Sequence, residues 1–136
     1  MTTAFWMLTI LCCSYAAWFG RSDGRCASLL ILAAVVLTTV AQVLDTDWTA
    51  THWPVTIVDV LLWVALIHLM LRSRSYWPMW MAAAQTLTVA THAATSLITQ
   101  FNQEAYVGLG TVWSIPCLLS MAIGVSLDSR RNRAGL

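Results

Sequence analysis

Acid–base chemistry in this chain would centre on Asp59 and His92, because each is ionisable and each lies inside an apolar stretch. Counted along helices, Asp59 lies about 7 Å and His92 about 8 Å below the same expected membrane boundary. The two stretches are joined only by residues 72–76, so they should be antiparallel neighbours. An isolated carboxylate in lipid is costly and needs a partner. The sequence therefore predicts that Asp59 pairs with His92.

A polar stripe surrounds this expected pair. Gln85, Thr88 and His92 recur at spacings of three and four residues, which places them on one helix face. Gln42, on another apolar stretch, is expected to join them. Two interpretations stay open: interhelical hydrogen bonding worth about 0.6 to 2 kcal/mol per bond, or a proton or ion site at Asp59 with His92 as relay.

Cofactor and metal chemistry have little basis in the sequence, and we expect neither. The four cysteines show no C-x-x-C or C-x-x-C-H spacing. A bis-histidine haem needs two imidazoles at one depth, whereas His68 would lie about 13 Å deeper than His92, and His52 falls in a connector. A redox subunit that contacts haem, quinone or a pigment through a single histidine stays open as an alternative.

Five apolar stretches must position these side chains, and they leave no room for a soluble domain. Of 136 residues, 59% are apolar and only 10% are charged, against about 25% charged in soluble proteins. Helices of this length reach across a ~30 Å hydrocarbon core. We expect an all-α integral membrane protein, a single domain over residues 1–136, with spans at about residues 4–19, 26–44, 54–71, 77–98 and 105–127.

The basic residues predict an orientation. The chain has no lysine, and its arginines fall in the first connector, the third connector and the C-terminal tail: Arg21, Arg25, Arg72, Arg74, Arg130, Arg131 and Arg133. Alternating basic and non-basic connectors predict an external N-terminus and a cytoplasmic C-terminus. The pattern resembles that of small multispan inner-membrane proteins of bacteria, which implies the inner membrane. Short clusters beside spans favour orientation signals, so the expected partner is the lipid bilayer and not nucleic acid.

The last stretch carries signals for close helix packing. Ser120 and Gly124 form a small-xxx-small spacing, which lets two helices approach closely. Pro116 removes a backbone donor and frees the carbonyl of Val112. The facing helix belongs either to this chain, to a second copy or to another integral membrane subunit.

Enzymatic motifs are missing from the sequence. Only one acid lies within the apolar stretches, and neither G-x-S-x-G nor H-E-x-x-H occurs. We therefore expect no catalysis, and a small accessory or assembly subunit of a larger membrane complex. The first alternative is an oligomeric channel or transporter coupled to protons or ions through Asp59 and His92, and the second is the redox subunit.

Overall fold

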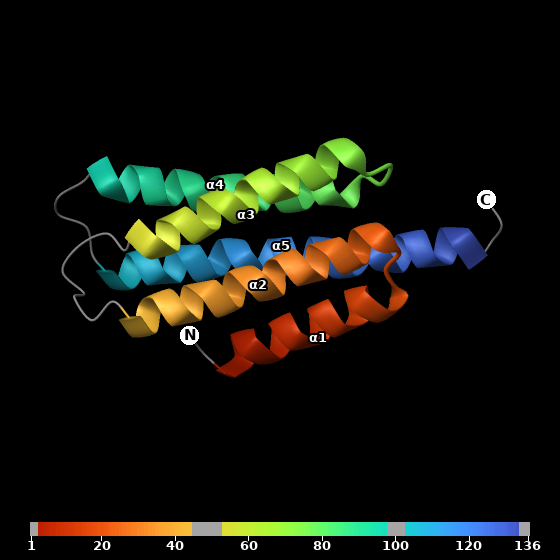
Figure 1. Cartoon of the computed structure of the whole chain (residues 1–136), viewed down its shortest axis with the longest axis horizontal. Coiled ribbons are helices and arrows are strands. Elements are labelled where there is room, and N and C mark those ends of the chain that lie inside the picture. Colours follow the sequence, from red (N-terminus) through yellow and green to blue (C-terminus); the bar gives the residue numbers. More distant parts are fainter. Residues whose placement is uncertain (1–2, 45–52, 98–102, 134–136) are drawn as a thin grey trace.

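The computed structural model describes residues 3–44, 53–97 and 103–133, with backbone alone for 44, 96–97, 103–111 and 132–133. These residues are helical apart from two short turns. The five helices are α1 (Thr3–Phe19), α2 (Ser22–Leu44), α3 (Trp53–Arg72), α4 (Trp77–Leu97) and α5 (Gln103–Arg133). They lie roughly alongside one another in a single bundle (Figure 1).

Two helix ends differ from the apolar boundaries. α1 ends where the Gly20 amide donates to the Ala16 carbonyl at 2.9 Å, and α2 then begins at Ser22 and not at residue 26. Asp23 favours this early start, because an acid in the first turn complements the helix dipole. α5 continues to Arg133 and not only to residue 127. Hydropathy marks the end of the apolar segment, whereas backbone hydrogen bonding carries a helix further into polar sequence.

The helices form a closed ring of neighbours. Each packs against the next along the chain, and α5 closes the ring by packing on both α4 and α1. Buried side chains from all five helices form one core. The core residues with the lowest exposure include Ala16, Ala27, Leu66, Met81, Leu118 and Met121.

Membrane-spanning character is clear in part of the bundle. Among the described residues, three helical segments are long and apolar enough to cross a membrane: Ser22–Val43, Trp53–Arg72 and Val112–Arg131. α1 is a shorter apolar helix. α4 is long enough but carries the polar stripe, which lowers its hydropathy. The chain is thus a helical bundle with the character of a membrane protein.

Candidate functional site

Asp59 and His92 meet on the seam between α3 and α4. His92 Nε2 lies 2.7 Å from Asp59 Oδ2, and the two side chains are only 7% and 19% exposed, respectively. The turn between the helices is short and runs from residue 73 to residue 76, so α3 and α4 return side by side and bring equal depths together. The geometry allows the imidazole N–H to donate to the carboxylate, a charge-assisted bond of the shorter kind.

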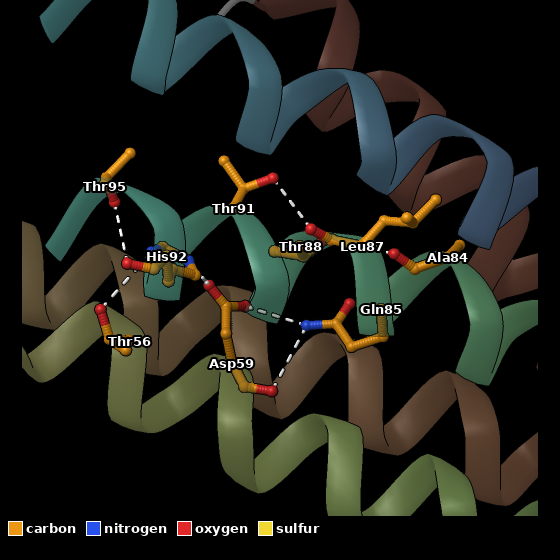
Figure 2. A network of polar contacts seen from close by, with 9 residues as sticks. All are labelled: Thr56, Asp59, Ala84, Gln85, Leu87, Thr88, Thr91, His92 and Thr95. Atoms are coloured by element: carbon orange, nitrogen blue, oxygen red, sulfur yellow. Dashed lines mark hydrogen bonds and ion pairs between the residues drawn. The ribbon is translucent and has the colours of Figure 1, made fainter. Parts of the chain in front are cut away.

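Gln85, about two helical turns along α4 from His92, is the second hydrogen-bond donor to the carboxylate. Its Nε2 donates to Asp59 Oδ1 at 3.2 Å and lies 3.4 Å from the Asp59 carbonyl oxygen. Figure 2 shows the Asp59 side chain of α3 between Gln85 and His92 of α4. Each carboxylate oxygen therefore accepts a hydrogen bond from a different α4 side chain.

Thr56 lies on the other side of the imidazole. Its Oγ1 is 3.5 Å from His92 Nδ1. If His92 donates through Nε2 as a neutral ring, Nδ1 is an acceptor, and the Thr56 hydroxyl is suitably placed to donate to it. We call Thr56, Asp59, Gln85 and His92 the α3–α4 polar cluster.

Two residues expected in the cluster form no hydrogen bond with it in the described part of the chain. Thr88 is buried, but its hydroxyl donates to the Ala84 carbonyl of its own helix at 3.4 Å. Gln42, on α2, is partly exposed and has no hydrogen-bond link to the cluster in the described part of the chain. α2 packs on α3 and not on α4 among the described residues, so a matching depth alone does not bring Gln42 to this seam.

Toward the α3–α4 turn, the buried residues of the seam change from polar to apolar. One turn beyond Gln85 lies Met81, and the same half of α3 carries Leu66 and Leu69; all three are buried members of the apolar core. On the outward face of the seam, Trp63 Nε1 donates to the Thr86 hydroxyl at 2.9 Å, a link that the sequence did not suggest. The polar cluster thus ends about halfway along the α3–α4 contact.

The packing signals on α5 point to α4 of the same chain. A Cβ added at Gly124 would overlap the Trp77 side chain. Ser120 donates to the Pro116 carbonyl at 2.6 Å, so its hydroxyl is satisfied within α5. α5 remains continuous through Pro116.

The arginines gather at one end of the bundle, where the α1–α2 turn, the α3–α4 turn and the last turns of α5 meet (Figure 1). Arg25 donates through Nε to the Ala17 carbonyl at 3.3 Å, and Arg130 is exposed. Arg133 ends α5, and its side chain lies outside the described residues. The remaining four, Arg21, Arg72, Arg74 and Arg131, line one cavity.

Two aspartates at this end were missed in the sequence. Asp23 accepts from Ser73, and Asp128 accepts from Ser75 and Trp77, at 2.6 to 3.0 Å. These bonds fasten the α3–α4 turn to α2 and α5. The only signal in the sequence was that each acid stands beside an arginine cluster.

No metal or haem ligand set is assembled within the described ranges. No three His, Cys, Asp or Glu side chains come together there. His68 is exposed on α3, about 13 Å along the helix from Asp59, and His52 lies outside the described residues. No family model, curated protein or solved structure matches this chain.

Proposed function

We propose that this chain is a five-span protein of the inner membrane, with its N-terminus outside and its C-terminus in the cytoplasm, that serves as a non-catalytic accessory or assembly subunit of a larger membrane complex. The observation that carries the proposal is that both carboxylate oxygens in the polar cluster have hydrogen-bond partners within the chain. Asp59 is held at both carboxylate oxygens by side chains of α4. A carboxylate with two partners in its own chain is suited to fixing one helix against another.

The apolar half of the seam supports the same role. Between the cluster and the arginine-rich end of the bundle, α3 and α4 carry the buried core residues Leu66, Leu69 and Met81. A proton path through this seam would need polar side chains or water along its whole length. In this role the polar cluster fixes α3 against α4 through hydrogen bonds. The bundle then provides a rigid surface on which neighbouring subunits pack.

The test is the composition of the native assembly. The protein would be extracted from its own membrane in mild detergent, and the mass of the assembly and the identity of every co-migrating chain would be determined. We expect other integral membrane proteins in a fixed ratio to this chain. An assembly that contains only copies of this chain would overturn the proposal.

The 2.7 Å contact between Asp59 and His92 favours a second candidate, a proton- or ion-coupled oligomeric channel or transporter. Both residues are ionisable, and intramembrane pairs of this kind serve proton relays. In this candidate the conducting path lies between protomers, where the 19% exposure of the Asp59 side chain provides access.

Purified protein in liposomes with a pH-sensitive dye inside distinguishes the two candidates. A transporter would acidify the lumen under a proton gradient, and Asp59→Asn would abolish this flux while the variant still folds. Thr91→Val is the matched control, because Thr91 bonds only to the Leu87 carbonyl of its own helix and should leave flux unchanged. Absence of flux in the wild type would rule out the proton-coupled form.

A further inference from the structure

A second polar site lies at the opposite end of the bundle from the α3–α4 polar cluster. It is a cavity of about 680 Å³ between the α1–α2 turn, the α3–α4 turn and the C-terminal part of α5. This volume is in the range of small-molecule sites, roughly 300 to 1,000 Å³. Four guanidinium groups line it, from Arg21, Arg72, Arg74 and Arg131.

The arginines are not neutralised by the acids beside them. Asp23 and Asp128 also line the cavity, but their hydrogen bonds come from Ser22, Ser73, Ser75 and Trp77. Within the described part of the chain, none of the four arginines forms an ion pair. Four arginines against two aspartates leave the cavity with an excess of two positive charges.

Backbone groups add to the positive potential. The first residues of α2, Ser22, Asp23 and Gly24, line the same cavity. α4 adds no such group, because Pro78 has no N–H and the Met79 amide donates to the Tyr76 carbonyl. Helix N-termini present unpaired amide N–H groups and the positive end of the helix dipole. Together with planar guanidinium forks, which match phosphate oxygens in bidentate geometry, they make a phosphate group the best-fitting ligand chemistry.

Exposed aromatic side chains surround the end of the bundle that holds the cavity, as expected at the level of a membrane interface. Trp18, Tyr76 and Trp80 are 86%, 81% and 63% exposed around this end of the bundle. Aromatic rings of this kind gather where lipid headgroups meet the hydrocarbon. Basic pockets between membrane helices at this level are suited to anionic headgroups.

We infer that this cavity binds a phosphate-bearing anion, with an anionic phospholipid headgroup as its source. Arg21 and Arg131 hold the phosphate from α1–α2 and α5, while Arg72 and Arg74 hold it from the α3–α4 turn. The bound headgroup would link three segments that are far apart in the sequence. This site is independent of the accessory role proposed above.

The test compares two charge-matched double variants. Arg21→Gln with Arg131→Gln removes two cavity arginines, and Arg25→Gln with Arg130→Gln removes one arginine from each of the same two segments, outside the cavity lining. Each protein is placed in phosphatidylcholine nanodiscs with increasing fractions of phosphatidylglycerol, and the thermal midpoint is followed. The rise of the midpoint with the anionic lipid gives an apparent affinity.

We expect phosphatidylglycerol to stabilise the wild type and the control double variant, and the cavity double variant to bind it on the order of tenfold more weakly. Equal weakening in both double variants, or none in either, would overturn the inference, because general surface charge would then explain the data. If the cavity double variant does not fold, Arg21→Lys with Arg131→Lys keeps the charge and removes the bidentate geometry, and it should still bind several-fold more weakly.

Inorganic phosphate identifies the source of the anion. Added to protein in pure phosphatidylcholine, it should stabilise the wild type far less than phosphatidylglycerol does. Stabilisation by phosphate that equals the lipid effect and depends on the same arginines would support the phosphate site but overturn the lipid source.

Discussion

At the scale of single residues, the strongest feature is that the Asp59 carboxylate has two hydrogen-bond donors, both on α4. An apolar side chain in place of either donor would offer no hydrogen bond. His92 and Gln85 each hold one carboxylate oxygen. Removing one donor from a largely buried acceptor costs more than the bond itself, because the acceptor is left without a partner. The two members of such a pair should therefore be energetically coupled.

His92→Ala should lower the free energy of unfolding by about 1 to 3 kcal/mol. Asp59→Ala should lower the free energy of unfolding less in the His92→Ala background than in the wild type. The difference, which is the coupling energy of the pair, should be on the order of 1 kcal/mol. Unfolding in detergent with increasing dodecyl sulfate measures all three variants. Thr91→Ala, one residue away from His92, should change stability by less than about 0.5 kcal/mol. Additive effects of the two alanine variants would contradict the pairing.

At Gly124, the size of the side chain determines how closely α5 can approach α4. Because a methyl group there would overlap Trp77 of α4, Gly124→Ala should destabilise the protein by about 1 to 3 kcal/mol as in other overpacked contacts. Ser120→Ala, the other half of the same motif, loses only a bond within α5 and should be nearly neutral. Thermal unfolding of both variants in the same detergent tests this, and an equal effect would show that Gly124 does not set the α4–α5 distance.

At the scale of elements, α3 and α4 behave as one hairpin fixed at both ends. The polar cluster joins them near one end, and Asp128 of α5 accepts from Ser75 and Trp77 at their connecting turn. Asp128→Ala should leave both donors without this acceptor and loosen the turn, while the helices stay folded. Hydrogen exchange of residues 73–77 should accelerate, with residues 81–92 little changed; uniform acceleration would indicate global destabilisation instead.

At the scale of the whole molecule, the proposed topology is testable without knowledge of the function. All described connectors that carry arginine lie at one end of the bundle (Figure 1), which agrees with one basic membrane face. A fluorescent protein that matures only in the cytoplasm should be fluorescent when fused to the C-terminus. The same protein fused to the N-terminus should not be fluorescent. An N-terminal phosphatase that works only outside the cytoplasm should be active. The reverse pattern, or equal signals, would contradict the five-span orientation.

The sequence by itself determined the helical class, the approximate positions of the helices and the one contact that a short connector constrains. The short 72–76 connector forces neighbouring antiparallel helices, so matching depths were sufficient to predict the contact between Asp59 and His92. Five spans and their orientation stay predictions, because three helical segments in the described chain qualify on length and hydropathy.

Only the tertiary structure decided what depends on rotation about a helix axis and on contacts between distant segments. It left Gln42 out of the cluster, because α2 packs on α3 and not on α4 in the described part of the chain, and it directed the Thr88 hydroxyl to the Ala84 carbonyl of its own helix. It placed α5 between α4 and α1, brought Gly124 against Trp77, and assembled four arginines from three separate segments around one cavity. Periodicity describes each helix alone, whereas these contacts follow from how all five pack together.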